Sequence, residues 1–278
     1  MSYKTILVHL NDRRRTEAML EPVIQLATRY NSHLTGLHVD AIMAEPPLAF
    51  TYATSGLGPA AAEDRANGEA IAAIFTRMTA TGACAAEWQQ LKVPQGDLVT
   101  VVLEHGRTAD LIVAGQVNPD WDLSPVFDFP ERLALESGRP VLVIPYVGRY
   151  PRIGRNVVIA WKAGRETTRA VFDALPLLKG AENVHVLEVV GRADEKSLAT
   201  DTTSIAASLA RHGIKPSIRT SIAPDISVGD EILSRLSDLD ADLLVMGAYG
   251  HSRMRELVFG GVTRHIARHM TVPTLLSH

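Results

Sequence analysis

The sequence predicts an α/β protein made of two similar halves, each with a parallel sheet flanked by helices. Two observations support this prediction: short apolar runs alternate with helical periodicity, and the pattern of the first half recurs in the second. Hydrophobic residues make up 46% of the 278 residues, so each half has the material for a sizeable core. Strand and helix alternation of this length favours crossover connections and parallel strands.

The repeat unit is a whole domain. The segment ADLIVAG at Ala109–Gly115 corresponds to ADLLVMG at Ala241–Gly247, and TILVHL near the start corresponds to VVIAW at Val157–Trp161. The two copies are joined by YVGRYPRIGR, in which Gly, Pro and Arg interrupt the apolar runs. We therefore expect an N-terminal domain over 1–147 and a C-terminal domain over 153–278.

The expected strands are rich in Val, Ile and Leu, as buried parallel strands are. In the first half they cover 4–10, 33–39, 84–91, 110–115 and 141–145, and in the second half 156–161, 183–190, 217–222, 242–247 and 272–276. Helical spacing of apolar residues predicts helices in the second half over 165–179, 197–212, 227–239 and 262–270. The first half differs by a long loop, roughly 41–60, that is rich in Pro and Gly.

Composition narrows the functional classes. The net charge of −3 and an aromatic content of 5% argue against nucleic-acid binding. Cys84 is the only cysteine, so no internal disulfide is possible, which is compatible with a reducing compartment. The N-terminus shows no signal peptide, and no apolar run reaches the roughly 18 residues of a membrane span. We expect a cytoplasmic protein without a membrane span.

The segment MGAYGHSRMRELVFGGVTR, which begins at Met246, combines glycines with cations between a predicted strand and a predicted helix. Ligands of open parallel sheets bind beyond the carboxyl ends of the strands, and a helix N-terminus favours anions. Glycines let the backbone approach a phosphate closely. The segment therefore fits a phosphate-binding loop, with His251, Arg253, Arg255 and Arg264 as nearby cationic or potentially cationic groups. Ordinary turn glycines and solvated charges are the alternative reading.

The spacing Gly247-x2-Gly250-x9-Gly260 resembles the ATP-binding loop of the universal stress protein family, G-x2-G-x9-G-[S/T]. The stretches GAYGHSR, GGVTRH and AWKAGRETTRA resemble the tandem form of the family, and the resemblance covers both halves. It implies two Rossmann-like domains of the adenine nucleotide alpha hydrolase-like type, each with a five-stranded parallel sheet.

The resemblance also implies a function, namely binding of ATP or AMP, with or without Mg²⁺, in the C-terminal domain. Adenine would meet the backbone at the end of the second strand, and ribose and phosphates the loop after the fourth. The implied binding residues are Lys162, Val189, Val190, Met246, Gly247, Gly250, His251, Ser252, Arg253, Gly260, Gly261, Val262 and Thr263.

Such a protein would be a regulatory stress-response protein with an unidentified protein partner, and at most a slow ATPase. Single-domain members of the family form dimers through their edge strands. In a chain with two fused domains, either the two domains pair with each other in this way, or two copies of the tandem chain form a homodimer. Two alternatives remain open from the sequence. One is a scaffold or interaction protein that binds a small apolar ligand instead of a nucleotide, and the other is a phosphotransferring or hydrolysing enzyme.

The chain departs from the family pattern at two points. Gly261 stands where the family has a hydroxyl, although Thr263 follows two residues later. The family's acid after the first strand is replaced by Lys162 in the second half and by Asn11 in the first. Lys162 can meet a phosphate as a point charge, although a plain surface lysine is equally compatible with the sequence.

The N-terminal half has lost the glycine loop. Negative charge stands where phosphates would lie, at Asp120, Asp122 and Asp128, and two prolines each remove a backbone donor. We therefore predict that this half binds no triphosphate, and that it is structural or takes a different ligand under the 41–60 loop.

Other motifs carry less weight. Gly56-x-Gly58-x-x-Ala61 fits a dinucleotide motif in letters only, because no strand precedes it, and no Walker-type loop is present. Ser252 lacks the setting of a nucleophile elbow. His265 and His269 have a spacing that can chelate a metal, but no acidic partner accompanies them. We expect no metal site and no catalytic residue.

Overall fold

The computed structural model describes residues 2–42, 57–80, 82–94, 98–118, 129–191, 200–223, 225–249 and 261–278. Its elements in the first half are β1 (Thr5–His9), α1 (Arg13–Tyr30), β2 (His33–Ile42), α2 (Leu57–Thr79), β3 (Ala85–Pro94), α3 (Leu98–Gly106), β4 (Leu111–Gly115), α4 (Phe129–Glu136) and β5 (Val141–Ile144). Those of the second half are β6 (Asn156–Ala160), α5 (Arg165–Asp173), α6 (Leu175–Leu178), β7 (Asn183–Gly191), α7 (Thr200–Arg211), β8 (Ser217–Ala223), α8 (Val228–Asp238), β9 (Leu243–Gly247), α9 (Gly261–His269) and β10 (Thr274–Ser277).

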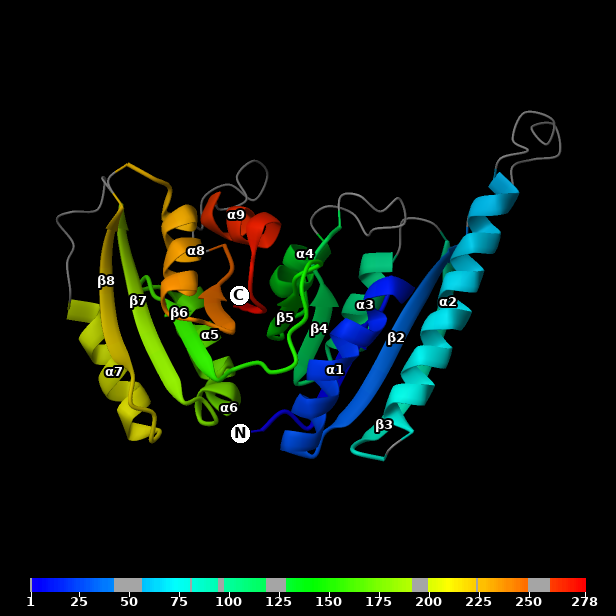
Figure 1. The fold of residues 1–278 in the computed structure, drawn as a ribbon, viewed down its shortest axis with the longest axis horizontal. Coiled ribbons are helices and arrows are strands. Elements are labelled where there is room, and N and C mark those ends of the chain that lie inside the picture. The colour runs from blue at the N-terminus through cyan, green and yellow to red at the C-terminus, as the bar shows by residue number, and fades with distance from the viewer. Residues whose placement is uncertain are drawn as a thin grey trace.

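The ten strands form one continuous sheet in the order β3-β2-β1-β4-β5-β10-β9-β6-β7-β8 (Figure 1). Every pairing within each half is parallel. The halves meet where β5 and β10 pair antiparallel, with Leu142 opposite Leu275. The predicted α/β class with five parallel strands per half is confirmed, and the expected edge-strand pairing occurs within one chain.

Helices cover both faces of the sheet, and two apolar layers separate them from it. One layer joins the sheet to α1, α2, α5, α6 and α7, and the other joins it to α3, α4, α8 and α9. Alternate residues of a strand enter opposite layers, as Ile6 and Leu7 of β1 do. The central strands are therefore buried on both faces, which explains their uninterrupted Val, Ile and Leu runs.

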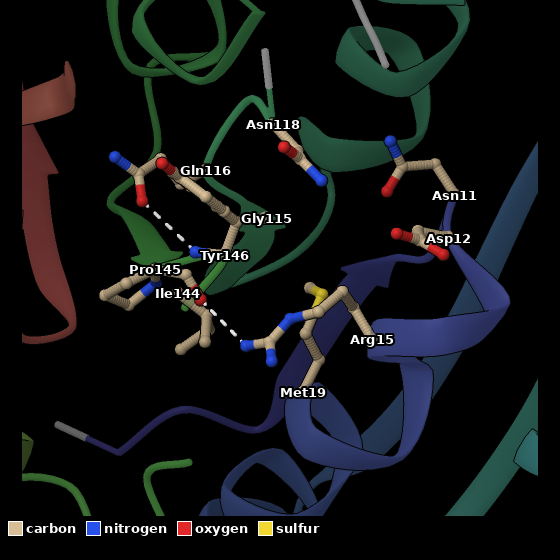
Figure 2. A pocket seen from close by; sticks show the side chains of 10 residues that line it. All are labelled: Asn11, Asp12, Arg15, Met19, Gly115, Gln116, Asn118, Ile144, Pro145 and Tyr146. Atoms are coloured by element: carbon tan, nitrogen blue, oxygen red, sulfur yellow. Dashed lines mark hydrogen bonds between the residues drawn. The ribbon is translucent and has the colours of Figure 1, made fainter. Parts of the chain in front are cut away.

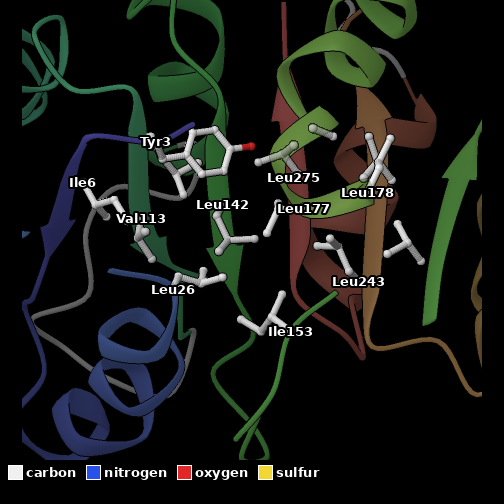
Figure 3. Packing of buried hydrophobic residues seen from close by; sticks show 14 of the residues in the cluster. Tyr3, Ile6, Leu26, Val113, Leu142, Ile153, Leu177, Leu178, Leu243 and Leu275 are labelled. Atoms are coloured by element: carbon white, nitrogen blue, oxygen red, sulfur yellow. The ribbon is translucent and has the colours of Figure 1, made fainter. Parts of the chain in front are cut away.

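The first apolar layer continues across the junction between the halves (Figure 3). Leu142 of β5 and Leu275 of β10 belong to it together with Leu177 of α6, and all three are buried. Two tyrosines of the first half reach the second, because Tyr3 Oη donates to the Asp173 carbonyl at 2.6 Å and Tyr30 Oη to that of Pro176 at 3.0 Å. The division at 147 and 153 stays a prediction, since both sides share one core.

Two elements differ from the sequence expectation. The helix expected over 165–179 is divided into α5 and α6, with Ala174 between them and a proline in the first turn of α6. Helix α2 begins at Leu57, inside the loop expected over 41–60, and Pro59 is tolerated because it lies in the first turn. Among the residues described, no helix is long and apolar enough to cross a membrane.

The aspartate of the repeated ADL motif has the same role in both halves. Asp242 Oδ1 accepts hydrogen bonds from the backbone N–H groups of Gly154, Arg155 and Asn156, at 2.9–3.0 Å, just before and at the start of β6. Asp110 Oδ2 accepts from the N–H groups of Lys4 and Thr5 at 2.8 and 3.0 Å. Each carboxylate therefore fixes the entry of the chain into the first strand of its half.

We expect the Asp242→Ala substitution to destabilise the fold by about 2 kcal/mol, because it leaves three amide N–H groups without their acceptor. Urea unfolding measures this change. Asp238→Ala is the control: it removes an exposed ion pair with Arg235 and should cost less than about 1 kcal/mol. Equal effects of the two substitutions would contradict a structural role for the repeated aspartate.

His9 gives the fold a pH dependence. Its ring is 1% exposed, lies 4.9 Å from the Phe129 ring between centroids, and burial together with the charge of His38 lowers its pKa to about 3. Between pH 6.5 and 3 the unfolded chain binds a proton at this position that the folded chain excludes. Stability should therefore fall as the pH drops through this window, by at most about 1.4 kcal/mol per pH unit from His9.

Urea titrations at several pH values between 7.5 and 4 test this prediction on the unmodified chain and on His9→Phe. The variant should show a shallower loss of stability on acidification, since it has no proton to take up at this position. An unchanged slope would mean that His9 is not the responsible group.

Candidate functional site

The carboxyl ends of β6, β7 and β9 meet at one edge of the sheet, because these strands are parallel neighbours. Ala160, the last residue of β6, pairs with Met246 of β9 and with Leu187 of β7. The predicted binding residues Lys162, Val189–Val190 and Met246–Gly247 therefore come together at this edge. Met246 and Val190 are each 5% exposed, so their side chains belong to the core and the backbone forms the surface.

Helix α9 begins at the same edge. Its first residue, Gly261, is exposed, and a Cβ there would have no atom of the described residues within 4 Å. Thr263 is 5% exposed, and its Oγ1 accepts a hydrogen bond from the backbone N–H of Tyr249 at 3.4 Å. Tyr249 itself has a left-handed backbone (φ 58°), which turns the chain sharply after β9. The first N–H groups of a helix lack intrahelical partners, so this end of α9 is suited to an anion.

Five of the predicted binding residues lie outside the described residues: Gly250, His251, Ser252, Arg253 and Gly260. The described part of the site consists of the ends of the three strands and the first turn of α9. Thr263, which the sequence offered as a replacement hydroxyl for a ligand, holds the start of the loop against α9 in this structure.

Gly247 has a packing role that the sequence did not reveal. A Cβ at this position would lie 2.5 Å from the Thr167 nitrogen and 2.6 Å from the Glu166 carbonyl carbon, both in the backbone of α5. The first turn of α5 therefore packs directly against the end of β9. This close approach brings the N-terminus of α5 to the same edge as the N-terminus of α9.

Two further residues at this edge escaped the sequence interpretation. His278 Nδ1 donates to the Ala248 carbonyl at 2.9 Å, and because a carbonyl only accepts, Nε2 is left to accept from Arg165 Nη2 at 3.3 Å. Arg165, the first residue of α5, also lies 3.3 Å from Glu166 between Nε and Oε1. Arg165 follows the exposed Lys162 by three residues, so two cationic side chains lie close together in the sequence after β6. Only the run of Lys and Arg after β6 could have pointed to it.

The corresponding edge of the first half is filled by its own side chains (Figure 2). Arg15 crosses from α1 to the segment after β5 and donates to the carbonyls of Pro145 and Gly148 at 3.0 and 3.1 Å. The space left between Arg15, Asn11 and Gly115 measures about 20 Å³, which is little more than one water molecule requires. This volume is far too small for a phosphoryl chain.

The two halves also differ at the end of their second strands. Leu10 N donates to Leu37 O as Trp161 N does to Leu187 O, so Asp40 of β2 corresponds to Val190 of β7. Asp40 is 7% exposed and lies 3.0 Å from His38 Nε2. It also accepts from Gln90 Nε2 at 2.8 Å. A buried carboxylate thus replaces the apolar residue that stands beside the expected adenine position in the second half.

His265 and His269 are engaged with other groups. Their rings lie 4.5 Å apart between centroids, His265 Nε2 is 2.8 Å from Asp230 Oδ1, and His269 Nδ1 donates to the His265 carbonyl at 2.9 Å. Within the described ranges, no group of three or more His, Cys, Asp or Glu residues is arranged to hold a metal ion. The histidine pair is therefore part of the contact between α8 and α9.

Comparisons with known proteins agree with the fold. Residues 155–278 match the model of the universal stress protein family. A universal stress protein from Archaeoglobus fulgidus DSM 4304 superposes with a TM-score of 0.71 at 15% sequence identity, covering 98% of this chain and 95% of the other. A protein of unknown function from Pseudomonas aeruginosa PAO1 superposes with a TM-score of 0.59 at 16% identity, covering 99% and 92%.

The search of curated proteins found no relative of the chain. The family match and the fold nevertheless agree, since the matched residues contain β6 to β10 and the structural similarity extends over both halves. Residues 155–278 therefore form a domain of the universal stress protein family, and the whole chain has the fold of the tandem two-domain form.

Proposed function

We propose that the second half binds an adenine nucleotide, ATP or AMP, at the carboxyl edge of β6, β7 and β9, and that occupancy regulates a stress response. The single observation that carries the proposal is the convergence of two helix N-termini on this edge. The first turn of α5 lies against Gly247, and a Cβ at Gly261, where α9 begins, would meet no atom of the described residues. Two helix dipoles and their free amides favour a polyanion there.

The side chains at this edge fit the same ligand. Lys162 and Arg165 supply positive charge on the side of α5, and Arg165 is held in place by His278. The backbone of Val189–Val190 offers hydrogen-bonding groups for an adenine edge. The two side chains are apolar, and that of Val190 is buried in the core. Donors and cations of this kind bind anions, so the proposal assigns regulation rather than catalysis. Mg²⁺, when present, would arrive with the phosphates of ATP.

The first half has a supporting role in this proposal. Arg15 fills the position at which phosphates would lie, and Asp40 stands near the expected position of adenine. We therefore propose one nucleotide per chain. We also propose a cytoplasmic location, and a second protein, or a second copy of this chain, that recognises the nucleotide-bound form.

Isothermal titration calorimetry of the purified protein with AMP and with ATP, each with and without Mg²⁺, tests the proposal. One binding site per chain is the expected result. Absence of heat at millimolar nucleotide would reject it and would favour the scaffold or apolar-ligand alternative. Two sites per chain would reject the supporting role of the first half.

Substitution of Gly261 by Leu should separate binding from folding. A Cβ at this position meets no atom of the described residues, and Leu is a better helix former than Gly. The side chain would nevertheless cover the amides of the first turn of α9. We expect at least a tenfold loss of affinity for AMP and ATP in calorimetry, with an unchanged urea unfolding midpoint. Ala207→Leu, exposed on α7, is the control.

Lys162→Ala should weaken ATP more than AMP, because a point charge interacts with each added phosphate. We expect a loss of about tenfold for ATP and a smaller loss for AMP, and the difference should shrink at high salt. Lys215→Ala, an exposed lysine at the far end of the second half, should change neither affinity. Equal losses for the two nucleotides would place Lys162 away from the phosphate chain.

A further inference from the structure

A cavity of about 380 Å³ lies where the two halves meet, between the first turn of α4 and the last turn of α9. These helices lie near the centre of the molecule, above the junction of β5 and β10 (Figure 1). The volume is at the lower end of the roughly 300–1,000 Å³ of small-molecule sites. Because its walls come from both halves, the cavity exists only in the assembled tandem.

A buried glutamine holds the walls of this cavity together. Gln116, 8% exposed, follows β4 and donates through Nε2 to the carbonyls of Ala267 and Arg268 at 2.9 and 3.0 Å. Its Oε1 accepts from the backbone N–H of Tyr146 at 3.1 Å, the contact drawn in Figure 2. The side chain thus satisfies carbonyls at the end of α9 that a helix leaves unpaired. Three hydrogen bonds of Gln116 therefore fix the cavity wall, and two of them cross the junction.

The lining has an apolar part and a charged part. Val117, Pro130 and Ala267 form the apolar part, and Arg268 and His269 stand together on the α9 side. Within the described ranges, no carboxylate lies within ion-pair distance of Arg268. Glu131, 4% exposed, lines the α4 side. An anionic group in the cavity is therefore attracted to the α9 wall, and an apolar group of the same ligand fits beside Val117 and Pro130.

We propose that this cavity binds a small organic anion with an apolar body, whose charged group meets Arg268 and His269. It is separate from the proposed nucleotide site, because the two sites lie at opposite ends of α9, whose nine residues make it roughly 13 Å long. Arg268 can bind the anionic group of the ligand through charge-assisted hydrogen bonds. The apolar body gains by leaving water against Val117 and Ala267.

Anilinonaphthalene sulfonate, an apolar ring system with one sulfonate, is a suitable probe. Its fluorescence on titration should report one site per chain, with binding retained when AMP is saturating. Ala267→Phe, which fills the cavity, should abolish the signal, and Arg268→Ala should weaken binding at least tenfold. The controls are Ala207→Phe on α7 and Arg264→Ala, one turn earlier on α9, and both should bind as the unmodified protein does.

Calorimetry with AMP on Ala267→Phe keeps the two proposals apart, because this variant should bind AMP normally and shows thereby that it is folded. Displacement of the probe by AMP, or equal binding by Ala267→Phe and the unmodified protein, would overturn the proposal of a second site. So would the absence of any probe signal up to millimolar concentration. Failure of AMP to bind the unmodified protein would reject the nucleotide site alone.

Discussion

The antiparallel pairing of β5 with β10 is the interaction on which the rest of the structure depends. Both strands are buried, with Leu142 and Leu275 at 0% exposed. A half on its own would expose this apolar strand together with its unpaired backbone N–H and C=O groups. Joining the halves satisfies those groups and merges their cores, which is why the protein is one ten-stranded sheet.

The same junction positions the helix that contacts both proposed sites. Helix α9 begins at the carboxyl edge of β6, β7 and β9 and ends at Gln116, a residue of the other half. One short helix therefore contacts the proposed nucleotide site at its start and the cavity between the halves at its end. Because the carbonyls of Ala267 and Arg268 are tied to the first half, the position of α9 depends on how the halves are packed.

The two halves show how one architecture can carry two different sheet edges. Asp110 and Asp242 fix the first strand in each half in the same way, and both sheets have the same strand order. The edges differ because single side chains differ: Arg15 closes the first, whereas at the second a Cβ on Gly261 would meet no atom of the described residues. Strand pairing uses backbone groups and tolerates such substitutions, while a ligand site depends on each side chain at the edge.

The sequence alone determined the class of the fold, the repeat, and most elements to within a few residues, such as β1, expected over 4–10 and found at Thr5–His9. It also indicated that Lys162, Val189–Val190 and Gly247 lie at one edge of the sheet, because local patterns encode periodicity and parallel topology. The β5–β10 pairing, the closure by Arg15, the contact between Arg165 and His278, and the packing of α5 on Gly247 emerged only in the tertiary structure. Each of these joins residues far apart in the chain, about 80 to 135 positions, and no local pattern encodes which distant side chain will fill a given space.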